Sequence, residues 1–454
     1  MLGLTIRNEH TFFLLNELTI KKKTNTLDCI HYISQNPINN VIQLYNLSSK
    51  IKIYTNTLTK PPQNLLLAIK FNKSGNNKYL FGGPANIYFD KNNNVWITNN
   101  VVQGKTISSN FAIVLKPNGE PCDFSPVLNG GILGSGFGII NDKENNIIIS
   151  NYGWGGLLPY PSGSISKFKT NGQAITPSAR EGNSGGNQKG IYRVQGLQVD
   201  KYNNLWIASA GNNRVVVYIN CDENNLRYYQ VKNGTLFDNT TDHNKSHVYF
   251  SSRKDNTNNK SGEILQFTFN KTTNSIVLKK EYIGNQGESF YGITTDAHDN
   301  VYANASNLNS VYKFDKDLNL LQIITGGGLS SPWGNFMDSG NNLFVANFGS
   351  NSNGLFCFSH FRNDGKALSP RNGFVLESGG NQVRLTTGDP LYGNIDKPCF
   401  KPFIRQTGLN VDIAGNLWVC NNWKPDPEID ATTNPGGDGM VVFIGYAKPS
   451  NIKI

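Results

Sequence analysis

The chain has 454 residues, a formal net charge of +10 and only 16% charged residues. The excess positive charge is spread along the sequence, with Lys21–Lys23 as a short run, so the dense basic stripe of a nucleic-acid-binding protein is missing. None of the six Cys residues forms a Cys-x-x-Cys pair, which excludes zinc-finger spacing.

The N-terminal segment is a poor match to a signal peptide. Its apolar run in residues 1–18 is interrupted by Asn16 and Glu17, and no clear cleavage site follows. No stretch of the sequence approaches the apolar length that spans a bilayer. An intracellular location is therefore the default expectation, although the sequence contains no signal for a particular compartment.

From residue 81 onward, one hairpin pattern recurs along the chain. Two apolar strands are joined by Asp-x-x-x-Asn in six copies: Asp90–Asn94, Asp142–Asn146, Asp200–Asn204, Asp296–Asn300, Asp338–Asn342 and Asp412–Asn416. A degraded seventh copy starts at Asp242, with Ser246 in the Asn position. The residue before each Asn is Asn, Asp or Gly, the types that tolerate the positive φ of a tight turn. We therefore interpret the Asp and Asn residues as turn chemistry and not as catalytic groups.

An aromatic residue occupies one equivalent position in the second strand of most copies. These residues are Trp96, Trp206, Tyr302, Phe344 and Trp418. Burying such a side chain contributes about 1.5–3 kcal/mol or somewhat more. We predict that they pack in the core or between sheets and do not form a binding surface.

The spacing of the repeats indicates the fold. A further short strand follows each hairpin, and successive Asp residues lie between 42 (Asp200 to Asp242) and 74 (Asp338 to Asp412) residues apart. Repeats of roughly 40–50 residues with about four strands each are typical of a β-propeller. We predict an all-β chain with seven four-stranded blades, six blades being the second choice. Residues 1–38 are expected to form an N-terminal extension and residues 39–454 a single propeller domain.

The last copy predicts how the ring closes. Its third strand, Met440–Phe443, is followed by little further chain. A strand from the N-terminal region, within residues 40–47 or 51–57, is expected to complete that blade. Closure of the ring would remove the exposed sheet edge.

The repeat resembles those of the NHL-repeat and streptogramin-lyase-like propellers. The residues that carry the resemblance are Gly-φ-x-φ-Asp-x-x-x-Asn-φ-Trp-φ frames (φ here an apolar residue), as in residues 196–207 and 408–419, and it extends from Phe81 to Ala447. For the lyases it implies a His general base and Mg²⁺ at the channel mouth. No His stands five to seven residues before any of the six clear Asp residues, where the innermost strands should face the channel.

Long loops predict which face of the propeller carries function. The insertions at residues 152–163, 172–192, 362–404 and 422–438 fall between the second and third strands or between blades, and these two kinds of loop share one face. Three groups of residues there are candidates for a site. The first is a ring of carboxamides at the ends of second strands: Asn99, Asn151, Asn347 and Asn421. They could bind a divalent cation such as Ca²⁺ or Mg²⁺, or each could cap its own turn.

The other two groups are charged. Asp426, Glu428, Asp430 and Asp438 offer the hard oxygen ligands that suit Ca²⁺, or they form a solvated acidic loop. Arg193, Tyr291, Trp333 and Arg405 could hold an anionic or sugar-like ligand by charge and stacking, or could pack at the strand starts.

Two functions remain open from the sequence. The first is a monomeric binding scaffold that takes a protein, a glycan or a small polar ligand, but no nucleic acid, on its loop-bearing face. The alternative is a divalent-metal-dependent lyase or lactonase-type hydrolase with its site at the channel mouth. A mouth carboxylate that converges with Asn347 and Asn421 would favour the enzyme, and a mouth filled by aromatic residues would favour the scaffold.

Overall fold

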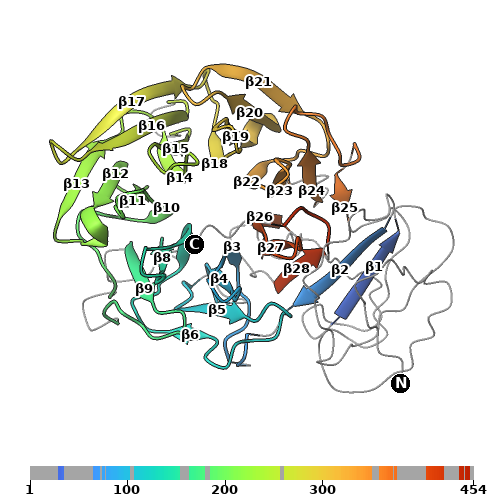
Figure 1. Cartoon of the computed structure of the whole chain (residues 1–454). Coiled ribbons are helices and arrows are strands. Elements are labelled where there is room, and N and C mark those ends of the chain that lie inside the picture. Colours follow the sequence, from blue (N-terminus) through green and yellow to red (C-terminus); the bar gives the residue numbers. More distant parts are fainter. Residues whose placement is uncertain are drawn as a thin grey trace, which may run out of the picture.

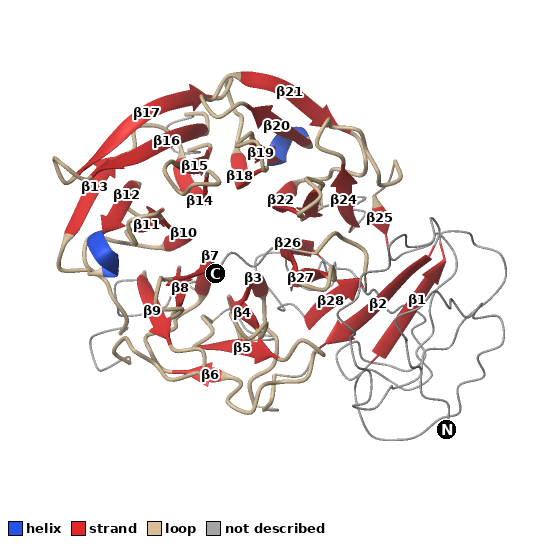
Figure 2. Ribbon diagram, in the orientation of Figure 1, coloured by secondary structure: helices blue, strands red, loops and turns tan. Residues whose placement is uncertain are grey.

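Seven antiparallel sheets are arranged around a central channel, with the first strand of each nearest the axis (Figure 1). The computed structural model describes residues 29–34, 65–71, 74–76, 78–102, 107–153, 163–178, 185–255, 260–349, 357–371, 373–375, 405–423, 439–443 and 445–449. Figure 2 shows strands throughout the ring, and the described residues also include the short 3₁₀ helices η2 (Ile219–Cys221) and η3 (Ser306–Leu308). The prediction of a seven-bladed β-propeller is confirmed.

The first three blades follow one another in chain order. Blade 1 contains β3 (Pro84–Phe89), β4 (Val95–Asn99), β5 (Phe111–Leu115) and β6 (Val127–Leu128). Blade 2 contains β7 (Ser135–Asn141), β8 (Ile147–Asn151) and β9 (Ser164–Phe168). Isolated bridges from Ile165 to Asn187 and from Phe168 to Ala174 extend its outer edge. Blade 3 contains β10 (Val194–Val199), β11 (Leu205–Ser209), β12 (Arg214–Tyr218) and β13 (Leu226–Gln230).

The next three blades repeat the same order from inside to outside. Blade 4 contains β14 (Thr235–Thr241), β15 (Val248–Arg253), β16 (Glu263–Asn270) and β17 (Ser275–Ile283). Blade 5 contains β18 (Phe290–Thr295), β19 (Val301–Ala305), β20 (Ser310–Phe314) and β21 (Leu320–Thr325). Blade 6 contains β22 (Pro332–Met337), β23 (Leu343–Asn347), β24 (Cys357–Phe361) and β25 (Phe374–Val375).

Blade 7 joins the two ends of the chain. Its inner strands are β26 (Arg405–Val411), β27 (Leu417–Trp423) and β28 (Gly439–Phe443). The N-terminal strand β2 (Leu65–Phe71) pairs with β28, and β1 (Cys29–Ser34) pairs with β2 on the outside. Closure therefore uses a strand from the N-terminal region, but that strand is β2. The predicted segments 40–47 and 51–57 lie outside the described residues, and the domain boundary at residue 38 stays a prediction.

The recurring Asp organises each hairpin turn, as predicted. In blade 3, Asp200 Oδ1 accepts hydrogen bonds from the backbone N–H groups of Tyr202 (2.8 Å) and Asn204 (2.9 Å), and Oδ2 accepts one from Asn204 Nδ2 (3.0 Å). Asn203, between these donors, has a φ of +64°. The equivalent residue has positive φ in every blade: Asn93, Asn145, Lys245, Asp299, Asn341 and Gly415. The residue with positive φ thus allows the tight turn, and the Asp carboxylate fixes it through hydrogen bonds.

The Asp also anchors the aromatic residue of the second strand, which the sequence analysis did not anticipate. The indole Nε1 of Trp96, Trp206 and Trp418 donates to Oδ2 of Asp90, Asp200 and Asp412 at 2.9, 2.9 and 3.0 Å. All three indoles are fully buried. Seven hydrophobic clusters fill the seven interfaces between neighbouring blades, and these Trp residues belong to them, as predicted. The spacing of six residues from Asp to Trp is the signal that could have revealed the bond.

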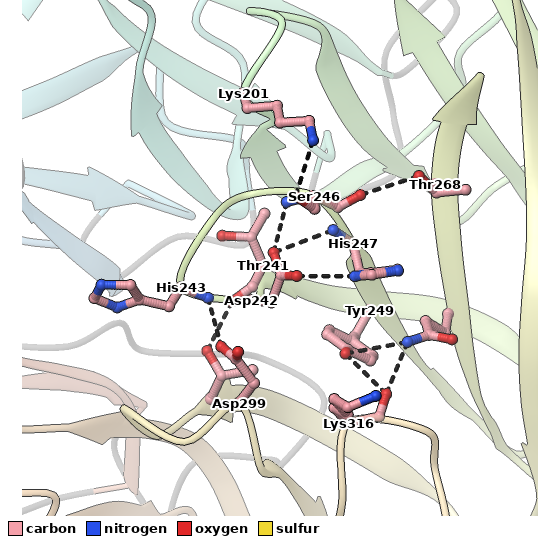
Figure 3. A network of polar contacts seen from close by, with 12 residues as sticks. Lys201, Thr241, Asp242, His243, Ser246, His247, Tyr249, Thr268, Asp299 and Lys316 are labelled. Carbon is pink, nitrogen blue, oxygen red and sulfur yellow. Dashed lines mark hydrogen bonds and ion pairs between the residues drawn. The ribbon is translucent and has the colours of Figure 1, made fainter. Parts of the chain in front are cut away.

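Blade 4 keeps the turn with different residues (Figure 3). Asp242 accepts hydrogen bonds from the backbone N–H groups of Ser246 (2.6 Å) and His247 (3.1 Å), and its Oδ2 lies 2.8 Å from His247 Nδ1. Burial raises the pKa of Asp242, but the hydrogen bonds from His247 and Ser246 outweigh this effect and hold the pKa below its ordinary value. The degraded copy therefore forms a complete hairpin within a four-stranded blade, and the propeller has seven blades and not six.

Glycine lets neighbouring inner strands come close together near the channel. Four residues before the Asp, most blades have Gly; a Cβ on Gly334 would lie 2.2 Å from the Thr407 carbonyl oxygen in the next blade. Blades 1 and 4 differ, because Asn86 and Asp238 occupy this position. In the described ranges, no helix is long and apolar enough to cross a bilayer.

Candidate functional site

The innermost strands bring one ring of side chains to the mouth of the central channel. These residues stand five positions before each Asp: Ala85, Phe137, Gln195, Phe237, Tyr291, Trp333 and Thr407. A cavity of about 280 Å³ is lined by all of them except Tyr291. Residues at or just after the ends of second strands also line it, among them Asn100, Arg253, Phe348 and Asn422. Arg405, at the start of β26, and Trp423, at the end of β27, complete this mouth cavity.

Aromatic rings form a continuous wall on one side of the mouth cavity. Phe237 lies 5.4 Å from Phe137 and 5.5 Å from Trp333 between ring centroids. Tyr291 packs against both Phe237 (4.9 Å) and Trp333 (4.4 Å), and Phe348 stacks on Trp333 at 4.7 Å. These contacts span blades 2, 4, 5 and 6, so the wall belongs to the ring as a whole and is held rigidly by it.

Two guanidinium groups lie over this wall. The Arg253 guanidinium carbon is 5.5 Å from the centroid of Phe237 and 5.8 Å from that of Tyr291. Within the described part of the chain, the Arg253 side chain makes no hydrogen bond or ion pair, and its Nε atom is buried. The Arg405 guanidinium lies 5.1 Å from the Phe348 ring, and burial lowers its pKa. A cation over aromatic faces in a partly dry cavity is favourable, but it still leaves the N–H donors of Arg253 available to an anion.

The structure brings three of the four predicted ligand-binding residues together. Trp333 and Arg405 line the mouth cavity, and Tyr291 supports Trp333 from behind. Arg193 lies apart from them, over the rings of Tyr152 (5.5 Å) and Tyr192 (5.7 Å), and it does not line the cavity. Their role in binding stays a prediction.

The predicted carboxamide ring is buried inside the blades. The Oδ1 atoms of Asn99, Asn151 and Asn347 accept hydrogen bonds from the N–H groups of Gly82, Leu133 and Ser330, at 3.0, 3.1 and 3.0 Å. Their Nδ2 atoms donate to residues at or near the start of the third strand, such as Ser109, Ser164 and Cys357. Asn421 is equally buried. A metal ion at these oxygens would compete with backbone donors, and the metal prediction stays untested.

The carboxamides that reach the mouth are one residue further along. Asn422 Nδ2 donates to Asn100 Oδ1 (2.5 Å) and to the Pro84 carbonyl oxygen (3.0 Å). Asn100 Nδ2 donates to the Ser135 carbonyl oxygen at 2.6 Å. These bonds connect blades 7, 1 and 2 at the rim. The acidic residues Asp426, Glu428, Asp430 and Asp438 lie outside the described residues.

Asp238 is a carboxylic acid that the sequence analysis did not single out. It follows Phe237 on β14, and among the residues four and five positions before each Asp it is the one acid. Its Oδ2 accepts a hydrogen bond from the Ile293 N–H (3.2 Å) on the neighbouring inner strand β18. Burial raises its pKa to about 7, against the opposing effect of hydrogen bonds from backbone N–H groups. Asp238 is thus a titratable group in the channel wall, directly after a cavity residue.

Known structures share this architecture. A catalytically inactive variant of virginiamycin B lyase from Staphylococcus aureus, determined with quinupristin, matches with a TM-score of 0.53 and 12% identity over 84% of this chain and 99% of that chain. A streptogramin B lyase structure matches with a TM-score of 0.53 and 12% identity over 83% of this chain and 97% of that chain. This chain has the streptogramin-lyase-like propeller fold.

At such low identity, the likeness to the streptogramin lyases concerns the fold alone. No protein-family model matches the sequence, and no curated protein matches it. The chemistry of this streptogramin-lyase-like propeller therefore has to be argued from its own mouth cavity.

Proposed function

We propose that this propeller is a binding protein whose mouth cavity takes a small ligand with an anionic group beside a flat apolar group. The observation that carries the proposal is the Arg253 guanidinium, which lies over the aromatic wall without a hydrogen bond or ion pair in the described structure. A carboxylate or similar anion would accept two parallel N–H bonds from it. The apolar part of the ligand would stack against Phe237 and Trp333.

The size of the cavity limits the ligand. About 280 Å³ is at the lower end of small-molecule sites. Such a volume suits one or two rings with a short acidic side chain, and it is too small for a folded protein. The carboxamides of Asn100 and Asn422 also line the cavity and would offer hydrogen bonds to a second polar group of the ligand.

The test is ligand binding with a charged probe and its neutral analogue. Indole-3-acetate is titrated into the protein and followed by isothermal titration calorimetry, with indole-3-acetamide as the uncharged comparison. We expect the acid to bind, the amide to bind at least about tenfold more weakly, and Arg253→Gln to remove that difference. Arg193→Gln is the matched control, because Arg193 also lies over tyrosine rings but outside the cavity wall. Equal binding of acid and amide, or equal effects of the two substitutions, would contradict the proposal.

A divalent-metal-dependent lyase or lactonase-type hydrolase at the same mouth is the second candidate. It is supported by the position and raised pKa of Asp238, since a carboxyl group that titrates near neutral pH suits general acid–base chemistry. Its test is a thermal melt of chelator-stripped protein with and without Ca²⁺ or Mg²⁺, with elemental analysis of the untreated sample. A cation that binds the folded state raises the melting temperature. A shift that Asp238→Asn abolishes would justify a screen of lactone and lyase substrates, and no shift would dismiss this candidate.

A further inference from the structure

A second and larger cavity lies at the opposite end of the propeller, where the first-to-second and third-to-fourth strands turn. It has a volume of about 780 Å³ and is built from the turns of blades 2, 3 and 4. Its wall includes Lys143, Lys201, Lys245 and Lys271, one from each of four turns, with Tyr202 and Phe269 between them. We refer to it as the turn-face cavity.

The four lysines remain available to an external anion. Lys201 Nζ donates to the Ser246 hydroxyl at 3.0 Å (Figure 3), and it lies 5.1 Å from the Tyr202 ring centroid. Lys271 Nζ lies 5.8 Å from the same ring. In the described ranges, no carboxylate pairs with the ammonium groups of Lys201, Lys245 or Lys271. Lys143 has a loose partner, Glu144, at 3.7 Å.

The carboxylates in the cavity wall are already engaged inside the protein. Asp200 binds Trp206, Asn204 and two backbone N–H groups of its own turn. Asp142 Oδ2 lies 2.5 Å from Lys167 Nζ, a lysine that does not line the cavity. Burial raises the pKa of Asp142, but the bonds from Asn146 and Lys167 outweigh this effect and hold the pKa below its ordinary value. Both carboxylates therefore face inward, toward their partners inside the protein.

Lys245 is the third residue after Asp242 in the turn of blade 4. Its φ is +51°, at the position where the other blades have Asn, Asp or Gly. A long side chain in this conformation costs more backbone energy than Asn or Gly. Lys245 lines the cavity and so adds a further ammonium group to those of its neighbours.

We propose that the turn-face cavity binds an acidic, extended peptide segment of a partner protein. The cavity runs across the turns of three consecutive blades, which suits an extended chain. The lysines would pair with its carboxylates, and Asn side chains of the wall, such as Asn220 and Asn274, carry the same amide donor and acceptor as a peptide backbone. Nucleic acid fits less well, because two ammonium groups already lie against the Tyr202 ring on which a base would stack.

The test uses a fluorescently labelled oligoglutamate peptide and the full chain, followed by fluorescence anisotropy. We expect binding that weakens as salt is raised, because screening acts on exposed charges. Combining Lys201→Gln, Lys245→Asn and Lys271→Gln should weaken binding by at least about tenfold. Lys245→Asn places the residue of blades 1, 2, 3 and 6 in this turn and so should preserve the fold.

The matched control is Lys91→Gln. Lys91 directly follows Asp90, as Lys143 and Lys201 follow Asp142 and Asp200, but it lies in the turn of blade 1, outside the cavity. It should change affinity less than twofold if the cavity, and not overall charge, binds the peptide. A melting temperature is measured for each variant, and the double variant Lys245→Asn/Lys271→Gln keeps the Lys201 bond to Ser246 in case the triple variant is unstable. An equal loss in Lys91→Gln, no binding at low salt, or tighter binding of a single-stranded oligonucleotide would overturn the proposal.

Discussion

At the scale of single residues, the propeller uses one Asp per blade to organise a turn, and Asp90, Asp200, Asp296 and Asp412 also bond a buried aromatic residue. Asp200 shows the arrangement in full, with two backbone donors, Asn204 and the indole of Trp206. Asp315 and Asn319 repeat the turn between β20 and β21, where Leu318 has a φ of +61°. The motif is thus a general solution for a tight turn in this chain, and it marks scaffold and not a site.

The raised pKa of Asp238 gives a pH dependence of stability with a defined sign. Its folded-state pKa of about 7 exceeds the value near 3.9 of an unfolded Asp, so the folded protein holds this proton more tightly. The stabilisation is present below about pH 4 and is lost as pH rises to about 7. We expect Asp238→Asn to raise the free energy of unfolding at pH 8 by about 2 kcal/mol and to flatten this part of the profile, measured by urea unfolding.

Two comparisons sharpen this measurement. Burial also raises the pKa of Glu263 to about 7, so Glu263→Gln should act in the same direction and the two effects should add. Asp123→Asn, at an exposed carboxylate, is the control and should not raise the free energy of unfolding at pH 8. A profile that keeps its slope in Asp238→Asn would show that Asp238 is ionised at low pH.

The site residues that the sequence analysis missed have a common cause. Arg253 and Asp238 both belong to blade 4, whose hairpin has Ser246 in place of the usual Asn and one extra residue, so that Tyr249 takes the position of the usual Trp. The frame was recognised there, but the mouth positions were read only from the six clear copies. The extra residue in the turn moves Arg253 to eleven residues after Asp242, whereas Asn100, Phe348 and Asn422 stand ten after their Asp residues. Counting four residues back from Asp242 would have found Asp238.

At the scale of strands, side chains alternate between the two faces, so the adjacent residues Asn99 and Asn100 have different surroundings. Both fall at the end of β4, but the first is tied to the Gly82 N–H and Ser109, and the second lines the mouth. Composition placed carboxamides at this end of the blade. Composition alone could not show which of two adjacent residues faces the channel. The direction of each side chain depends on a shift in strand register between Pro84 and Ile87.

The close approach of inner strands predicts a sensitive position at Gly334. Because a Cβ there would lie 2.2 Å from the Thr407 carbonyl oxygen, Gly334→Ala should separate blades 6 and 7. We expect a loss of about 1–3 kcal/mol in the free energy of unfolding, measured with urea. In Gly340→Ala, the nearest atom is the flexible side chain of Lys448, at 2.8 Å, so this control should cost clearly less. Equal costs would contradict the packing argument.

At the scale of the whole molecule, the repeat length and the aromatic residues were enough to predict a ring of seven blades. The closing strand was harder to predict, because β2 (Leu65–Phe71) carries no Asp-x-x-x-Asn frame and pairs with a partner far along the sequence. The turn-face cavity was not predicted at all. It arises from lysines in separate repeats, which only the curvature of the ring brings together.

Ring closure by β2 predicts a strong effect of truncation. Deleting residues 1–71 would leave β28 with an unpaired edge in the last blade, which exposes it to association with other chains. We expect a lower melting temperature and aggregation on size-exclusion chromatography. A deletion of residues 1–28, which keeps β1 and β2, is the control and should melt close to the full chain. A truncated protein without β2 that stays monomeric and equally stable would contradict this role for β2.

The pairing of β2 with β28 also sets an order of events during synthesis. Phe71 and Gly439 are 368 positions apart (439 − 71), so β2 leaves the ribosome long before its partner exists. At translation rates of about 5–20 residues per second, that interval is roughly 20–70 s. Blades 1 to 6 can form one after another on the nascent chain, while the edge of β2 that will pair with β28 has no partner. The last step of folding, the pairing of β2 with β28, therefore has to wait until translation is almost finished. The N-terminal strand is the part of the nascent chain that must be protected from association for the longest time.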